Sequence, residues 1–335
     1  MNFDEVLDDL RGKKLVIAYT ELPHWTPEDL QVGEEMVLSM QKGLIDLGLD
    51  VDQVKITDDV ESVMQKYDPK NTLVFNWCEG FGDDGYDYYT VPERLEAMGI
   101  VYTGCAPACL KLTTDKFITK QLLQDKGIRS PKYKFYEKDE PNGWSTFPAL
   151  CKPAREHSSY GITRESVVDN SEQMHKRIDD LQKEFECGIL VEDFIEGSEF
   201  NVAVWGNEKL EVLPIGMIDF SQFDDYHDKL VGFDAKWVEG SDSWNKTSVA
   251  CPAPIDETLK KALEDIAIEA YRACQCRDYA RVDVRVRGDL PYVLEVNSNP
   301  DITTDGGFIR SSGVLGYNYP MTIAKILSLA SKRLV

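Results

Sequence analysis

The segment of residues 279–297 has the most informative chemical spacing in the chain. It reads as two alternating strands joined by a turn near Asp289. Period-two alternation places Asp283 on the polar face of the first strand. If the hairpin is symmetric about Asp289, Asp283 lies opposite Glu295, with the opposed Cβ atoms about 5 Å apart. Two carboxylates would then face each other across the hairpin.

The opposed acids indicate a bound cation, because like charges directly opposed destabilise a sheet unless something cationic lies between them. Oxygen ligands from Asp283, Glu295 and Asn297 suit Mg²⁺, which completes its shell with water and substrate phosphates. The same register places Arg281 opposite Asn297. A magnesium site implies a nucleotide. The alternative is a solvated hairpin face with a slipped register, and this segment alone does not separate the two.

Two lysines elsewhere could hold phosphate oxygens. Lys152 ends an apolar strand and precedes a loop, residues 154–161, that contains the small hydroxyl side chains of Ser158 and Ser159. Lys116 begins a helix after a Thr-Thr-Asp sequence, where capping residues expose backbone N–H donors. Each lysine taken alone is more often a surface residue.

A third segment, residues 190–200, runs from a buried strand through an acidic turn into another strand. Glu192 and backbone groups could contact an adenine and Glu199 a ribose, or the segment could be an acidic hinge between domains. Spacing alone leaves both readings open. The sequence contains no Walker A lysine loop, and residues 80–85 lack the arrangement of a Rossmann fingerprint.

The elements that position these residues begin with a small α/β domain. Its strands are expected at 14–19, 51–56, 72–76 and 101, and its helices at 34–47 and 92–98. A second, α+β lobe follows, with helices at 115–126 and 171–185 and strands at 132–136, 149–153 and 189–191. The remainder is strand-rich, with helices at 256–273 and 320–334. We expect domain boundaries at 1–105, 106–190 and 191–335.

Composition excludes several classes of protein. The 335 residues exceed one small domain, and 42% apolar with 29% charged residues describe an ordinary globular protein. The net charge of -22 disfavours nucleic acid or an anionic membrane as partner, so any phosphate site must be built locally. The chain lacks a long apolar run, and its first ten residues carry acids where a signal peptide would be basic and apolar; we expect a cytoplasmic protein.

The eight cysteines are expected to be buried thiols rather than disulfides. The pairs Cys105 with Cys109 and Cys274 with Cys276 lack the two-residue spacing of zinc sites, and the four histidines are scattered. The spacing therefore argues against structural zinc.

Taken in order, these segments resemble the ATP-grasp superfamily, and most closely the D-alanine:D-alanine ligases, from about residue 76 to 326. Residues 75–85 and 95–104 resemble the stretch before that family's first ATP-binding lysine, here Lys116, with Lys120 on the same helix. Lys152 with its loop resembles the second lysine and its flexible phosphate loop. Residues 233–237 resemble the mobile loop that closes over substrates.

The resemblance implies an ATP-grasp fold with an N-terminal α/β domain, a central lobe and a C-terminal lobe. It implies ATP and Mg²⁺ as cofactors, two ions with Mn²⁺ as a substitute, and a homodimer. The implied ATP-binding residues are Lys116, Lys152, Ser158, Glu192, Phe194, Glu199 and Lys236. The implied catalytic residues are Arg281, Lys236 and Ser159, and the implied metal ligands are Asp283, Glu295 and Asn297.

The activity implied is an ADP-forming ligase that joins an amino acid or small peptide to an amine through an acyl phosphate. Metal and lysines would offset charge on the transferred phosphoryl group, Arg281 would stabilise the oxyanion, and closure of the Lys236 loop would exclude water. The alternatives are a true D-alanine:D-alanine ligase, and an ATP-grasp phosphotransferase or nucleotide-binding protein. A scaffold protein would leave the opposed acids unexplained.

One departure concerns the acceptor pocket. The D-alanine ligases carry Asn-Thr-x-Pro-Gly-Met-Thr after the metal ligands and a Ser-Leu pair that holds the acceptor carboxylate. This chain instead places Asp301 and Asp305 in that region. Glu79 also stands where those ligases have His-Gly, and His157 where their phosphate loop has Gly. The two acids favour a cationic or amine-rich acceptor over D-alanine.

Overall fold

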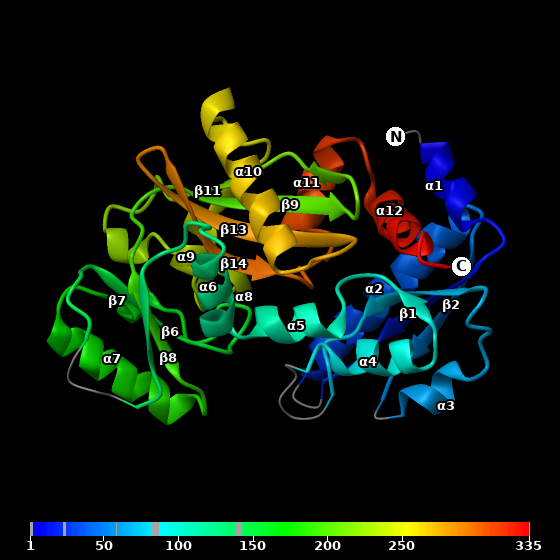
Figure 1. Cartoon of the computed structure of the whole chain (residues 1–335), viewed down its shortest axis with the longest axis horizontal. Coiled ribbons are helices and arrows are strands. Elements are labelled where there is room, and N and C mark those ends of the chain that lie inside the picture. Colours follow the sequence, from blue (N-terminus) through cyan, green and yellow to red (C-terminus); the bar gives the residue numbers. More distant parts are fainter. Residues whose placement is uncertain (1–2, 23–24, 58, 82–86, 139–142, 335) are drawn as a thin grey trace.

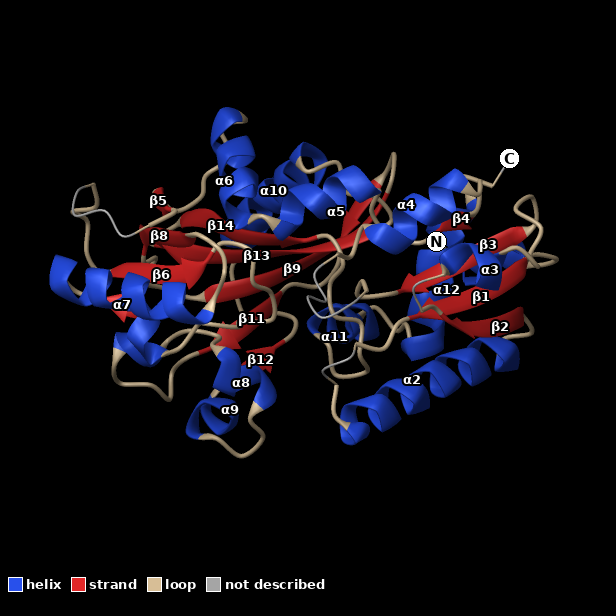
Figure 2. Ribbon diagram, turned by 90° about the horizontal axis from the view of Figure 1, so that it is seen from below, coloured by secondary structure: helices blue, strands red, loops and turns tan. Residues whose placement is uncertain are grey.

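The computed structural model describes residues 3–22, 25–57, 59–81, 87–138 and 143–334. Within them the strands form three sheets, each covered by helices (Figures 1 and 2). The α-helices are α1 (Phe3–Leu10), α2 (Pro27–Asp46), α3 (Val60–Met64), α4 (Thr90–Ala97), α5 (Pro107–Thr114), α6 (Lys116–Asp125), α7 (Ser171–Glu184), α8 (Phe233–Trp237), α9 (Asp242–Lys246), α10 (Glu257–Ala273), α11 (Gly307–Val314) and α12 (Tyr319–Ser331). The strands are β1 (Lys14–Tyr19), β2 (Asp50–Lys55), β3 (Thr72–Trp77), β4 (Val101–Tyr102), β5 (Tyr133–Tyr136), β6 (Ala149–Pro153), β7 (Val167–Val168), β8 (Ile189–Asp193), β9 (Glu199–Gly206), β10 (Leu210–Val212), β11 (Gly216–Asp219), β12 (Ser248–Ala250), β13 (Tyr279–Arg287) and β14 (Leu290–Asn297).

The first sheet is parallel, in the order β2-β1-β3-β4, as strand-helix-strand alternation predicted. Strand β1 is apolar at successive positions because both faces of the sheet are covered. Leu15 and Ile17 pack into a core with α1, α2 and α12, whereas Val16 and Ala18 pack into a separate core with α3 and α4. Alternate residues of one strand thus supply two cores.

The last helix, α12, packs against the first helices although it closes the chain. The Ser328 hydroxyl donates to the Asp9 carboxylate of α1 at 2.6 Å. Farther along, Arg333 donates to the fully buried Asp278 at 2.8 Å, and Asp278 also accepts from the Gly104 N–H at 2.9 Å. The carboxylate of Asp278 therefore joins three segments that are far apart in sequence.

The second sheet is antiparallel, with the order β12-β11-β9-β13-β14 and β10 paired to β9. Helix α10 covers one face, where Val282 and Val284 join its apolar side chains. On the other face Trp205 and Tyr279 pack on Phe308 of α11, in the same core that reaches the first sheet. This shared core holds β13 in a fixed relation to the first domain.

The third sheet is antiparallel, with the order β5-β8-β6-β7, and α7 covers one face. Strand alternation turns Cys151 and Val191 toward α7 and leaves Lys152 and Glu192 on the opposite face. Figure 2 shows this sheet next to β13 and β14. The charged residues of β6 and β8 therefore lie on the face that α7 leaves uncovered.

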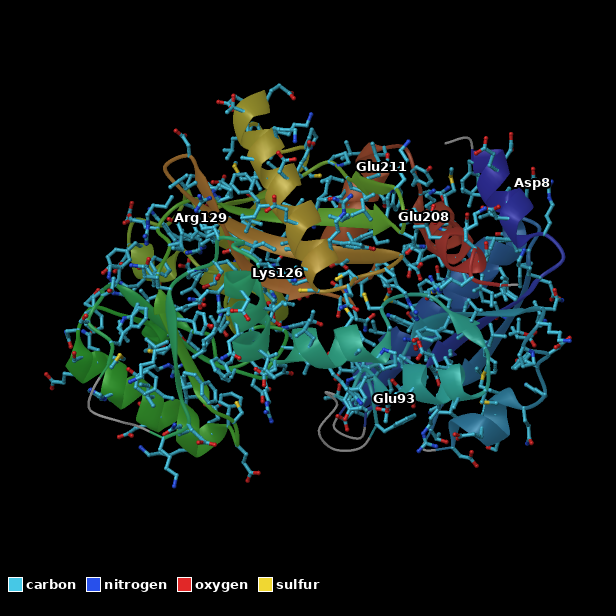
Figure 3. All side chains as sticks on the ribbon, viewed as in Figure 1. Asp8, Glu93, Lys126, Arg129, Glu208 and Glu211 are labelled. Carbon is cyan, nitrogen blue, oxygen red and sulfur yellow. The ribbon has the colours of Figure 1, made fainter. Side chains whose placement is uncertain are left out.

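Helix α6 lies near both antiparallel sheets (Figure 1). The carboxylate of Asp115 caps it by accepting from the N–H groups of Phe117 at 3.0 Å and Ile118 at 3.1 Å. Lys126 caps the C-terminal end of the helix, and Arg129 follows three residues later (Figure 3). Arg129 donates to the Pro291 carbonyl of β14 at 3.4 Å. Both ends of α6 are thereby fixed.

Most predicted elements are found within a few residues, and the largest difference is at α2. This helix begins at Pro27, seven residues before the expected start at 34. A capping box between Thr26 and Asp29 starts it, and proline suits the first helical position. Several short helices were not predicted, including α5 and α11. None of the helices within the described ranges is long and apolar enough to cross a bilayer.

Candidate active site

The β13–β14 hairpin has the predicted register at its polar end. Asp283 pairs with Glu295, and Arg281 pairs with Asn297. The turn, however, contains two residues, so simple symmetry would have paired Asp283 with Leu294. A bulge beside Asp283 absorbs one residue and restores the register. The two carboxylates face each other because of the bulge, not because the turn is centred on Asp289.

The carboxylate of Asp283 is surrounded by donors. Arg281 binds it with two bonds of 2.8 and 2.9 Å. Asn201 donates to Oδ1 at 2.8 Å, and Asn297 donates to Oδ2 at 2.8 Å. Part of the positive charge that the opposed acids require is therefore the Arg281 guanidinium. Bidentate arginine binding also fixes the orientation of Asp283.

Glu295 is the second acid, and lysines surround it. The ammonium of Lys116 lies 3.1 Å from its Oε1. Burial raises the pKa of Glu295, but Lys116, His157, Lys152 and Lys236 lower it, and the result is a pKa well below the usual range. The surrounding positive charges therefore favour the ionised form of Glu295.

The oxygen atoms at this end of the hairpin fit a hard divalent cation. Glu295 is an ionised carboxylate, and Asn297, which donates from Nδ2 to Asp283, keeps its Oδ1 as an acceptor. Asp283, Glu295 and Asn297 offer only oxygen ligands, the type that Mg²⁺ binds. Both oxygens of Asp283 already accept two bonds each, so Glu295 and Asn297 have the freer oxygens, and the metal site stays a prediction.

Lys116 is positioned by the chain on both sides. Its N–H donates to the Ala154 carbonyl at 2.9 Å, which joins the start of α6 to the end of β6. Its ammonium donates to the carbonyl of Glu156 in the predicted phosphate loop. Lys116 therefore lies between this loop and Glu295, as a lysine that binds phosphate would.

Lys152 and Lys120 share a single carboxylate, that of Glu192. Lys152 Nζ lies 2.7 Å from Oε1 and Lys120 Nζ lies 2.8 Å from Oε2. The three side chains are 6%, 1% and 2% exposed. The pKa of Lys120 is lowered to about 8, mainly by burial and also by the charge of Lys152, although the charge of Glu192 raises it. Two buried ammonium groups against one carboxylate leave a positive site for an anion.

The Glu192 carboxylate, predicted as an adenine contact, binds these two lysines, and its contact with adenine stays a prediction. From the sequence, Lys120 was noted only as a second lysine on the Lys116 helix, with no predicted role. A signal was present, because Lys120 follows Lys116 by four residues and thus lies on the same face of the helix.

Glu199 and Phe194, the predicted ribose and adenine residues, meet at Arg285. Its Nε donates to Glu199 Oε2 at 2.8 Å, and its guanidinium lies 5.0 Å from the centre of the Phe194 ring. Phe220 lies on the same guanidinium at 5.3 Å. Arg285 lies two residues after Asp283 and therefore on the same face of β13, and no function was predicted for it. Arg285 therefore contacts both of these predicted nucleotide-binding residues.

The two loops predicted to be mobile contact each other. Ser158 and Ser159 have φ angles of 54° and 67°, which non-glycine residues rarely adopt. The Ser159 hydroxyl donates to the Val231 carbonyl at 2.8 Å, and the Trp237 indole donates to the Ser158 carbonyl at 2.8 Å. The Tyr160 and Phe233 rings pack at 5.0 Å. The phosphate loop is thereby closed against α8.

Lys236 extends from α8 into this constellation. Burial lowers its pKa, and the Arg281 charge lowers it further, whereas Asp283, Glu295 and Glu199 raise it. The charge of Lys236 therefore interacts with charges of the hairpin and with Glu199, the partner of Arg285. Ser158 and Ser159 bond instead to residues in and just before α8, through the Trp237 indole and the Val231 carbonyl.

We expect Trp237→Phe to loosen the two loops. The phenyl ring keeps most of the packing but removes the N–H bond to the Ser158 carbonyl. Loss of a neutral hydrogen bond worth about 1 kcal/mol predicts roughly fivefold faster limited proteolysis within these loops. Trp244→Phe, in the exposed helix α9, is the matched control. Equal cleavage rates for the two variants would contradict the loop contact.

The region expected to receive the acceptor contains Asp301, which lies near two charged groups. The Asp301 charge adds to burial in raising the pKa of Glu79 to about 7, and it helps to raise the pKa of Arg281. Asp305 is an exposed residue whose carbonyl accepts from Arg310 at 2.9 Å. The structure thus brings Asp301 to Glu79 and Arg281. Residues 82–86 of the motif before Lys116 lie outside the described residues.

The backbone at Gly307 lies close to Arg281. A Cβ atom added at Gly307 would be 3.5 Å from Asn201 Oδ1 and 4.0 Å from Arg281 Cδ. Gly306 and Gly307 stand at the beginning of α11, where free N–H groups favour an anion. The first turn of α11 and Arg281 therefore face a common region beside Asp301.

Comparisons with known proteins match the family that the sequence motifs resemble. The model of the family described as "D-ala D-ala ligase C-terminus" matches residues 121–328. An uncharacterised protein, y4sG, of Sinorhizobium fredii is 35% identical over 263 residues, covering 78% of this chain and 75% of that protein. The D-alanine–D-alanine ligase of Actinobacillus succinogenes is 29% identical over 267 residues, covering 77% of this chain and 80% of the ligase.

A solved structure agrees over nearly the whole chain. The D-alanine–D-alanine ligase of Bacillus anthracis, complexed with ATP, superposes with a TM-score of 0.74 at 19% identity, covering 96% of this chain and 99% of that one. Its fold is shared from the first sheet to the last helix. The chain therefore belongs to the D-alanine–D-alanine ligase family and has its ATP-grasp fold.

Proposed function

We propose that this chain is an ATP-dependent, ADP-forming ligase that joins a carboxylate to an amine through an acyl phosphate. The observation that carries the proposal is that two clusters of charged residues, one around Glu192 and one around Glu295, share Lys152. Lys120 and Lys152, held by one glutamate, give a buried positive site, and Glu295 on the hairpin lies among Lys116, Lys152 and Lys236. Membership of a ligase family supports the same activity.

The reaction would proceed in two displacements. A carboxylate oxygen attacks the γ-phosphorus of ATP, and ADP leaves. An amine nitrogen then attacks the acyl carbon, phosphate leaves, and the amine proton passes to solvent. Lys116, Lys152 and Lys236 would offset negative charge on the phosphoryl group during the first step. Arg281 would stabilise the oxyanion of the second, while Asp283 fixes the plane of its guanidinium.

Asp283, Glu295 and Asn297 are proposed to hold Mg²⁺, which would neutralise phosphate charge when bound. Glu199 and Phe194 are proposed to face the nucleoside, both positioned by Arg285. The contact between the phosphate loop and α8 is proposed to exclude water. Water in the site would hydrolyse the acyl phosphate.

The first test is phosphate release from ATP with Mg²⁺ against pooled L- and D-amino acids, with mass spectrometry of the products. A ligase releases phosphate at full rate only when both a carboxylate and an amine are present. Rapid phosphate release without coupled product would contradict the ligase reading, as would transfer of phosphate to a stable product.

The acceptor is proposed to carry a second cationic group. Asp301 and Glu79 form an acidic pair beside Arg281, so an ammonium group there would be favoured and an uncharged side chain would not. D-alanine ligation is the alternative, supported by relatives named as D-alanine–D-alanine ligases that are 29% identical. A panel that contrasts D-alanine with diamino acids separates the two.

Asp301→Asn is expected to raise KM for the cationic acceptor about threefold, since Asp301 is exposed and an exposed charge contact contributes roughly 0.6 kcal/mol. The kcat value should change less, because the contact exists before the transition state. Asp305→Asn is the matched control, as that acid is exposed in the same segment. Equal effects of the two variants, or D-alanine as the best acceptor, would contradict the proposal.

The acidic pair also predicts a pH dependence. The pKa of Glu79 is raised to about 7, so its carboxylate becomes charged only as the pH rises through that value. KM for the cationic acceptor should therefore fall between about pH 6 and pH 8. Glu79→Gln should lose this change while it keeps the pH dependence that comes from the acceptor amine itself. Identical profiles for both proteins would contradict the assignment.

We also propose that residues 1–105, 106–190 and 191–335 form the N-terminal, central and C-terminal parts. Each sheet falls almost wholly within one part, since β1–β4, β5–β8 and β9–β14 follow one another in sequence. A homodimer is proposed from the family likeness alone. Light scattering after size-exclusion chromatography tests it.

A further inference from the structure

Three cysteines meet where the first domain joins the C-terminal sheet. Cys105 and Cys109 come from β4–α5, and Cys276 follows α10 just before β13. Their sulfur atoms all lie within 4.8 Å of one another, and those of Cys109 and Cys276 are 3.8 Å apart. Among His, Cys, Asp and Glu of the described residues, this is the group found close enough to share one ion.

We propose that Cys105, Cys109 and Cys276 form a site for a thiophilic metal ion, for which Zn²⁺ is the natural probe. A tetrahedral ion with Zn–S bonds of about 2.3 Å requires sulfur atoms roughly 3.8 Å apart. The Cys109–Cys276 separation already has this value. The other two separations need only small side-chain shifts to reach it. Solvent would complete the tetrahedron.

The surroundings suit a cluster of thiolates. The backbone N–H of Arg277 donates to the Cys105 sulfur at 3.5 Å, a bond of the kind that stabilises metal-bound sulfur. Leu110 lies in the same apolar cluster as Cys105 and Cys109. The three cysteines form a buried group, and Cys276 is the one whose residue is partly exposed, so an ion would enter on its side. On binding, the thiol protons would leave to solvent as the metal–sulfur bonds form.

The sequence argued against this site because zinc motifs were sought as closely spaced pairs. Cys109 and Cys276 are 167 residues apart, so only the fold brings them together. Ordinary packing of buried thiols is the competing explanation, since free cysteine often fills cores. It accounts for each cysteine being buried, but it does not require three sulfur atoms at mutual contact.

The position of the cluster indicates a structural role for the ion. Helix α5 lies between the first domain and the rest of the molecule (Figure 1) and leads directly into α6. Near its end, Thr113 shares a hydrogen bond of 2.6 Å with Ser298, the residue after Asn297. A metal ion would therefore tie α5 to the start of β13. This inference does not depend on the proposed ligase activity.

The test uses the full chain, reduced, stripped with a chelator and titrated with Co²⁺ and then Zn²⁺ under anaerobic conditions. We expect about one equivalent of Co²⁺ to give intense sulfur-to-metal charge-transfer absorption, which Zn²⁺ abolishes. Oxygen ligands at the hairpin do not produce that absorption. A protein that binds Co²⁺ without it would overturn the proposal.

Variants localise the site. Cys109→Ser should lose the absorption and lower Zn²⁺ affinity at least about 100-fold, whereas Cys187→Ser, a free and partly exposed cysteine outside the cluster, should match the parent. Because a serine variant may misfold, alkylation of the unaltered protein is a second measurement. Zn²⁺ should protect Cys105, Cys109 and Cys276 while Cys187 stays reactive. Equal labelling with and without Zn²⁺ would overturn the proposal.

Discussion

Glu295→Gln is expected to reduce kcat for ligation about 1,000-fold, which corresponds to roughly 4 kcal/mol of lost transition-state stabilisation. The amide keeps the size of the side chain but removes the charge that pairs with Lys116 at 3.1 Å. It also removes the carboxylate proposed as a metal ligand. Steady-state coupled turnover measures the effect.

The expected effect is large because Glu295 is both a proposed metal ligand and a counter-charge for the surrounding lysines. Lys116, Lys152 and Lys236 all act on its ionisation, so its removal changes their mutual repulsion as well as the metal site. Glu208→Gln, at an exposed glutamate beside α12 (Figure 3), is the matched control and should retain full activity. A Glu295→Gln protein within threefold of the parent would contradict the proposed site.

Glu192→Gln is expected to destabilise the protein by about 3–5 kcal/mol, the usual cost of removing one partner from a buried ion pair. Lys120 at 2.8 Å and Lys152 at 2.7 Å would be left as two buried ammonium groups without a counter-charge. The midpoint of urea unfolding should fall accordingly. A midpoint equal to that of the parent would contradict the charge arrangement.

A double variant separates charge from packing at the same place. Lys120→Met combined with Glu192→Gln removes one of the two uncompensated charges and keeps similar volume, so it should recover part of the lost stability. Failure of the second substitution to recover any stability would indicate that packing, and not charge, caused the loss.

The same carboxylate predicts a dependence of stability on acid. Burial raises the pKa of Glu192, but the charges and hydrogen bonds of Lys120 and Lys152 lower it by more. Its pKa in the folded state is therefore below its ordinary value of 4.5. The native ion pair thus contributes stability that is present above the unfolded pKa and is lost as the pH falls through the lower, folded value. Glu192→Gln should lack this part of the acid-induced loss.

The hairpin shows how far sequence reasoning reached. Period-two alternation placed Asp283 on the polar face of its strand, and the assumed turn centre at Asp289 placed Glu295 opposite it, which is the pairing that the structure has. The bulge that produces this register was not visible, since nothing in the local sequence fixes where a strand gains a residue. The prediction was correct in its outcome and incomplete in its cause.

Other parts of the site depend on contacts across the fold. No function was predicted for Lys120 or Arg285, because their partners Glu192 and Glu199 come from other strands. Pairing at that distance is set by packing. Short helices such as α5 were missed because their few turns depend on tertiary packing more than on periodicity.

The most direct test of the central claim uses the carboxylate substrate labelled with ¹⁸O in its carboxyl group, together with its amine acceptor, ATP and Mg²⁺. An acyl phosphate transfers one carboxylate oxygen to the phosphate that leaves, so mass spectrometry should find one ¹⁸O atom in each phosphate released with coupled product. Unlabelled phosphate would mean that water or another group attacked ATP, and it would contradict the proposed ligase mechanism.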